Sequence, residues 1–160
     1  MKKLIIVRHG AYDFSSERIN NYGKAQMCFL AENIDFEADM PHLETSAVQI
    51  ITSSAPRAVD SAETIAGELG ISLADIWKDP ALWSDTEHPQ DDETALDLID
   101  QYASNPDTDV LIVVTHLEYA RDLPEIFCSN VLNMHVQRTE LEIGQSIIID
   151  CEKKTTTIIP

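Results

Sequence analysis

Hydrophobic and polar positions along the chain predict strands and helices that alternate. Apolar runs typical of strands buried on both faces occur at 4–7 and 110–115, and the β-branched, mostly apolar segment 48–52 predicts a further strand. Apolar residues at helical spacing predict helices over 23–33, from Pro56 to a stop at Gly70, and over 91–103. A shorter strand is expected within 71–77, and the runs 146–150 and 155–159 predict a closing antiparallel pair.

Buried strands that alternate with helices are typical of an α/β fold. We expect a three-layer sandwich, in which a mostly parallel central sheet has helices on both faces. A length of 160 residues suits one domain, which we predict to span residues 1–160. No internal repeat or interdomain linker interrupts this pattern.

Three local features lead to more detailed expectations. The buried stripe of the helix over 23–33 is expected to consist of Ala25, Phe29 and Leu30. The segment 35–47 lacks periodicity and is predicted to be a connection, with His42 at the surface. Pro124 is expected to break the helix that begins at Glu118, because proline removes a backbone donor.

The chain is strongly acidic, with 28 Asp and Glu against 11 Lys and Arg and a net charge of −17. Such a surface argues against nucleic acid and anionic membranes as partners, since both require basic patches. A phosphorylated substrate would have to be bound by a few local cations. Residues 79–120 contain no Lys or Arg, which is typical of a solvated face; a docking site for a basic protein is the alternative.

Cysteine content and hydropathy indicate the compartment. The three cysteines, Cys28, Cys128 and Cys151, are far apart and form no CxxC, so neither a disulfide framework nor a zinc site is expected. The apolar run after Lys3 ends at Arg8, which is too short for a secretory signal. Nothing approaches the roughly 20 apolar residues of a membrane span. We therefore expect a cytoplasmic protein without a metal or other cofactor.

Four cationic or titratable side chains follow the three buried strands. Arg8 and His9 come directly after the first strand, and His116 comes at the end of the third. Arg57 lies in the first turn of the helix that follows the second strand. Carboxyl ends of parallel strands meet at one edge of a sheet, so these side chains are expected to lie close together. Arginine suits phosphate, and histidine can attack phosphorus or move a proton. The alternative is that each arginine pairs with a nearby carboxylate and His9 is a hydrogen-bonded loop residue.

The same motifs resemble those of the histidine phosphatase superfamily, the phosphoglycerate-mutase-like proteins with an Arg-His-Gly signature. The matching pieces are residues 8–10, 23–26, 53–58 and 64–66 and the strand that leads into His116, which together span residues 4–123. The short chain is most similar to the compact SixA-type phosphohistidine phosphatases. The resemblance implies the phosphoglycerate-mutase-like form of the three-layer fold.

The resemblance also implies a mechanism and a set of site residues. His9 would attack phosphorus and form a phosphohistidine, while Arg8, Arg57 and His116 hold the phosphoryl oxygens. The leaving group needs an acid, for which we expect Asp85, with Glu87 and Glu118 as the alternatives. Residues expected to contact the substrate are Gly10, Ser15, Leu117 and Glu118.

The expected activity is that of a metal-independent phosphatase acting on protein phosphohistidine or on a small phosphomonoester. A catalytically weak or inactive module that binds phosphate or protein is the first alternative, because the chain departs from the family pattern at Ala11, Tyr12 and Ser84 and in Leu117-Glu118. A metal-dependent hydrolase that uses His9, His116 and Asp85 is the second. Two arginines beside the same histidine argue against a cation there.

Overall fold

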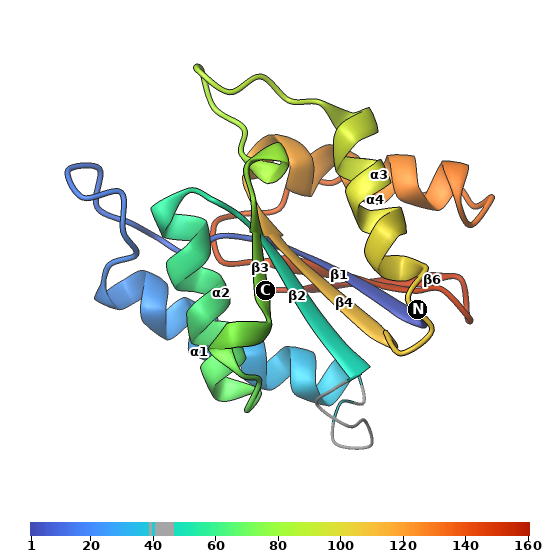
Figure 1. Cartoon of the computed structure of the whole chain (residues 1–160), viewed down its shortest axis with the longest axis horizontal. Helices are drawn as coiled ribbons and strands as arrows, with labels where there is room; N and C mark the ends of the chain where they lie inside the picture. The colour runs from blue at the N-terminus through green and yellow to red at the C-terminus, as the bar shows by residue number, and fades with distance from the viewer. Residues whose placement is uncertain (39, 41–46) are drawn as a thin grey trace.

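The computed structural model describes residues 1–38, 40 and 47–160 and contains a six-stranded sheet between two layers of helices (Figure 1). The strand order is β3-β2-β4-β1-β5-β6. The strands are β1 (Lys3–Arg8), β2 (Val48–Ser53), β3 (Ile76–Asp79), β4 (Val110–Thr115), β5 (Ser146–Asp150) and β6 (Thr155–Ile159). The pairs β3–β2, β2–β4 and β4–β1 are parallel, whereas β5 runs antiparallel to β1 and β6 antiparallel to β5. This confirms the predicted α/β sandwich with a mostly parallel sheet.

The helices cover the two faces of the sheet in pairs. They are α1 (Asn21–Glu37) and α2 (Pro56–Glu68) on one face, and α3 (Asp92–Ala103) and α4 (Leu117–Asn130) on the other (Figure 1). Side chains of β1 alternate between the layers: Ile5 and Val7 pack against α1 and α2, and Leu4 and Ile6 against α3 and α4. Within the described ranges, none of the helices combines the length and apolar content needed to cross a membrane.

Helix α1 is longer than predicted and turns a different face to the core. Its buried residues are Gly23, Met27, Leu30, Ala31 and Ile34. The expectation that Ala25 and Phe29 would be buried is wrong, because both lie on the solvent side. Apolar residues occur on more than one face of this helix, so the pattern does not fix which face is inward. His42 lies outside the described residues.

Two connections also differ from the expectation. Pro124 does not end α4, which continues through it to Asn130. Its neighbours Leu123, Phe127 and Cys128 are buried against the sheet, and this burial offsets the cost of the lost backbone hydrogen bond. The short strand β3 begins only at Ile76, after a 3-10 turn over Leu73–Asp75.

Candidate active site

His9 follows β1 directly and is buried, with only 5 % of its surface exposed. Its Nδ1 lies 2.9 Å from the carbonyl oxygen of Gly10. A carbonyl can only accept, so Nδ1 carries the proton and Nε2 keeps its lone pair. Arg57 Nε donates to this Nε2 over 3.3 Å. The backbone of the next residue therefore sets the tautomer that a nucleophilic imidazole requires.

His116 follows β4 and takes the N-cap position of α4. Arg57 Nη2 lies 3.2 Å from its Nδ1, and its Nε2 lies 2.8 Å from Ser53 Oγ. Arginine has no acceptor, so Nδ1 must accept and Nε2–H donates to the serine hydroxyl. The two imidazole centroids are 5.2 Å apart. One guanidinium thus contacts both rings, as expected from their places at the strand ends.

Ser53 ends β2, and its hydroxyl contacts His116. The N-cap of α2 is Ala55, which makes no side-chain capping bond. The hydroxyl of Ser53 instead accepts from the Ala55 backbone N–H at 3.2 Å and from His116. This partner of His116 is a site residue that the sequence pattern did not identify.

Both imidazoles are held neutral. Burial is the main cause that lowers the pKa of His9 to about 4. The hydrogen bond to the Gly10 carbonyl raises this pKa, and the positive charges of Arg57 and Arg8 lower it further. Burial also lowers the pKa of His116, and His9 and Arg57 add to the effect. Proton uptake would place a cation beside two guanidinium groups in a buried site. His9 therefore keeps a nucleophilic lone pair well below neutral pH.

Arg8 lies at the end of β1 and lines the same cleft. Its Nη1 donates to the carbonyl oxygen of Leu141 at 2.8 Å. The loop that carries this carbonyl also supports His9, because the N–H of Gly144 donates to the His9 carbonyl at 3.1 Å. Gly144 has φ +83°, a conformation that favours glycine. Nothing in the sequence pattern pointed to this loop.

The four predicted side chains line one open cleft of about 760 Å³. Its lining residues are Arg8, His9, Tyr12, Phe14, Arg57, Ser84, Asp85, Thr86, His116, Leu117, Glu118 and Ile143. Tyr12 meets the His9 ring edge-on at 5.3 Å, and Arg57 Cζ lies 5.0 Å from the centre of the Tyr12 ring. Of the residues predicted to contact substrate, Leu117 and Glu118 are in this lining, whereas Ser15 is exposed and is not among the lining residues.

Gly10 is not among the lining residues of the cleft, and its contacts in the structure are with α1 and α2. A Cβ at this position would lie 2.8 Å from the carbonyl oxygen of Gly23, so glycine is needed for close packing against α1. Its N–H donates to Ser61 Oγ at 3.0 Å, and this hydroxyl donates to the Arg57 carbonyl at 2.7 Å. Gly10 therefore holds β1 and α2 together at the site.

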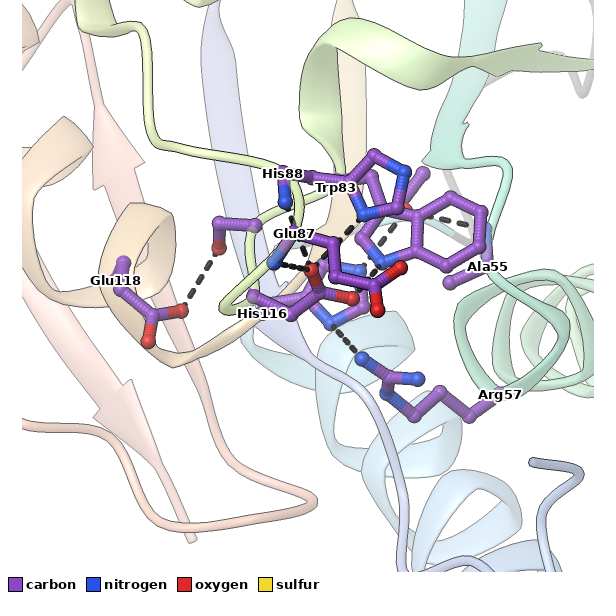
Figure 2. Close-up of polar contacts among 10 residues, drawn as sticks. Ala55, Arg57, Trp83, Glu87, His88, His116 and Glu118 are labelled. Carbon is purple, nitrogen blue, oxygen red and sulfur yellow. Dashed lines mark hydrogen bonds and ion pairs between the residues drawn. The ribbon is translucent and has the colours of Figure 1, made fainter. Parts of the chain in front are cut away.

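Asp85 lies at the rim of the cleft, in a loop where Trp83 stacks on His88 (Figure 2). Its carboxylate accepts hydrogen bonds from the Trp83 indole N–H and from the backbone N–H groups of Glu87 and His88. The Nδ1 atom of His88 lies 2.9 Å from the same carboxylate. Burial raises the pKa of Asp85, but these hydrogen bonds together hold it well below the ordinary range. A carboxylate held in this way stays ionised at neutral pH, the opposite of what the predicted proton donor requires.

Glu118 lies in the first turn of α4, beside His116. Ser84 Oγ donates to its Oε2 at 2.7 Å, the contact drawn beside Glu118 in Figure 2. Ser84 is buried and Glu118 is half-buried. The cleft therefore combines two guanidinium groups and two neutral imidazoles with two hydrogen-bonded carboxylates, those of Asp85 and Glu118.

The arrangement of His9, His116 and Asp85 does not support the metal-dependent alternative. In the part of the chain that the structure describes, no three His, Cys, Asp or Glu side chains come together as a set that could hold a metal ion. The cationic groups are the arginines, which suit the oxygens of a phosphoryl group.

Comparison with known proteins gives structural matches alone. No family model matches the chain, and no curated protein matches it either. The putative phosphohistidine phosphatase SixA from Agrobacterium tumefaciens superposes with a TM-score of 0.62 at 19% identity, over 93% of this chain and 91% of that one. Phosphoglycerate mutase from Plasmodium falciparum gives a TM-score of 0.58 at 17% identity, over 99% and 88%.

A phosphoserine phosphatase mutant from Entamoeba histolytica, solved in complex with phosphoserine, gives a TM-score of 0.59 at 14% identity, over 100% of this chain and 96% of that one. At these identities the likeness concerns the fold. It agrees with the resemblance that the Arg-His-Gly motif and its companions carried in the sequence. The chain therefore has the fold that phosphoglycerate mutase shares with the SixA and phosphoserine phosphatases.

Proposed function

We propose that the protein is a metal-independent phosphatase that forms a phosphohistidine intermediate on His9. The observation that carries this proposal is the state of that imidazole: Nε2 is unprotonated, the pKa is lowered to about 4, and Arg57 Nε donates a hydrogen bond to Nε2. The similar structures include a putative phosphohistidine phosphatase and a phosphoserine phosphatase, which supports a phosphorylated substrate. Protein phosphohistidine and small phosphomonoesters are the proposed substrate classes.

Substrate binding would change the partners of Arg57. Its Nε and Nη2 donate to His9 and His116 in the structure. Phosphoryl oxygens are better acceptors for guanidinium than neutral imidazole, so they would take over these donors. His9 Nε2 would then be free to attack phosphorus in line, and Arg8 and Arg57 would stabilise the charge on the oxygens in the transition state. Water would hydrolyse the phosphohistidine in the second step.

Asp85 is poorly suited to donate the proton that the leaving group needs, because its carboxylate is held ionised. A phosphohistidine substrate reduces this demand. Its imidazole can be protonated on the second ring nitrogen before the N–P bond breaks, and it then leaves as a neutral ring. An alkoxide leaving group has no comparable route, so a phosphoramidate is the favoured donor within the proposed substrate classes.

A trapping experiment tests the proposal. The protein is incubated with phosphoramidate in EDTA and quenched in base, and phosphorylated peptides are located by mass spectrometry. We expect acid-labile phosphate on His9, hydrolysis that EDTA does not reduce, and loss of both in H9A. H135A removes an exposed histidine outside the cleft and is the matched control. Binding of phosphate or vanadate without a phosphoenzyme or turnover would contradict the proposal and support an inactive binding module.

A further inference from the structure

The cleft has a negative charge in the wall beside its phosphoryl-binding cations. Glu118 lines the same cleft as Arg8 and Arg57. In the view of Figure 2, Glu118 and Arg57 lie on opposite sides of His116. The Glu118 carboxylate is near enough to Arg8 for its charge to oppose the lowering of the arginine pKa by burial. A phosphoryl group held by the arginines would therefore lie in the field of this carboxylate.

Glu118 is held in place by a hydrogen bond rather than by an ion pair with one of the described residues. The buried Ser84 donates to Oε2 at 2.7 Å, which orients the carboxylate. Glu118 lies in the first turn of α4, where a negative charge interacts favourably with the positive end of the helix dipole. Among the ion pairs of the described residues, none includes Glu118. By contrast, Asp85 has a histidine and an indole as partners.

A fixed carboxylate weakens the binding of a phosphate dianion unless the substrate brings a positive charge to it. We infer that Glu118 is a specificity-determining residue, which favours substrates with an ammonium or similar cation close to the phosphoryl group; this inference rests on the proposed phosphatase activity. The arginines take the phosphoryl oxygens, and Glu118 takes the cation. The two halves of such a zwitterionic substrate then match the two signs of charge in the cleft.

Three phosphomonoesters of equal length test this inference, because they differ only in the charge of the group at the far end. They are phosphoethanolamine, which is positive there, hydroxyethyl phosphate, which is neutral, and phosphoglycolate, which is negative. For the unmodified protein we expect kcat/KM to fall in that order, by about tenfold at each step for a charge several ångströms away in a partly solvated cleft. In E118Q the three values should come within about threefold of one another.

Glu125 supplies the matched control. It lies on the same helix as Glu118 but lines a different hollow, beside Asp122 and Arg138. E125Q makes the same change in net charge, and it should leave the order and spacing of the three substrates as they are in the unmodified protein. S84A keeps the charge of Glu118 but removes its orienting bond, so we expect an intermediate loss of selectivity.

Each other outcome overturns a stated claim. If E118Q keeps the full preference for phosphoethanolamine, or if the unmodified protein shows none, Glu118 does not select charge. If E118Q instead lowers kcat for all three esters equally, Glu118 acts on the leaving group and the inference is wrong. If the unmodified protein hydrolyses none of the three and also gives no phosphoenzyme with phosphoramidate, the proposed function fails first.

Discussion

Acidification should destabilise this fold through its two buried imidazoles before the carboxylates contribute. His9 has a pKa of about 4 in the folded chain, against about 6.5 for an ordinary histidine. Between these values the unfolded chain binds a proton that the folded chain does not, so the free energy of unfolding falls as pH falls. Carboxylates with lowered pKa values, such as Asp85 and Asp122, lose their contribution only at lower pH.

The size of the effect follows from proton linkage. Between about pH 7.5 and about pH 5, one histidine with these two pKa values removes about 2 kcal/mol from the free energy of unfolding. His116 has a still lower pKa and removes at least as much. The net charge of −17 works in the opposite direction, because acid reduces the repulsion among carboxylates. A comparison of variants cancels that shared contribution.

Urea denaturation at the two pH values measures the difference directly. We expect the loss of stability on acidification to be about 2 kcal/mol smaller in H9Q than in the unmodified protein, and smaller again in the H9Q/H116Q double variant. H135Q changes an exposed position outside the cleft and controls for the removal of an imidazole. Equal pH dependence in H9Q and the unmodified protein would show that His9 is not held neutral by its surroundings.

Four further outcomes are expected. G10A should lower the free energy of unfolding by about 1–3 kcal/mol in thermal melts, because its Cβ would lie 2.8 Å from the Gly23 carbonyl oxygen. G67A, at a helical position with no atom within 4 Å, should be neutral or slightly stabilising. S53A removes the acceptor of His116 Nε2–H, and we expect kcat to fall about tenfold while the fold remains stable. EDTA should leave phosphoramidate hydrolysis unchanged, and a loss that added divalent metal restores would contradict a metal-independent reaction.

The sequence predicted the parts of the site that are fixed by strand ends. Parallel pairing of β4 with both β1 and β2 places His116 between the segments that carry His9 and Arg57. Each of these residues follows an apolar run that is buried on both faces, so periodicity alone was enough to bring them together. The order of strands along the chain and the helices between them were predicted for the same reason.

The remaining contacts of the site join residues that are distant in the chain and that belong to no recognisable sequence motif. Arg8 donates to a backbone carbonyl at Leu141, and any residue there would supply the same oxygen. Ser84 and Glu118 form their hydrogen bond across 34 positions, between a loop and a helix. Asp85 was selected as an acid from its place in a loop, but its protonation state depends on Trp83 and on how the loop turns. Local pattern contains no signal for such partners.

The acidic surface and the cationic site do not conflict, because they act over different distances. At physiological salt a surface charge is screened within about 8 Å, whereas Arg57 is buried and in direct contact with His9. A phosphoryl group inside the cleft would therefore be bound mainly by the two arginines, while the net charge of −17 acts mainly on its approach. Glu118 is the exception, since it is half-buried beside the same groups and is screened least of the acidic residues at the site. Of the acidic residues that line the cleft, Glu118 is therefore the one best placed to influence which phosphorylated compounds the proposed phosphatase would accept.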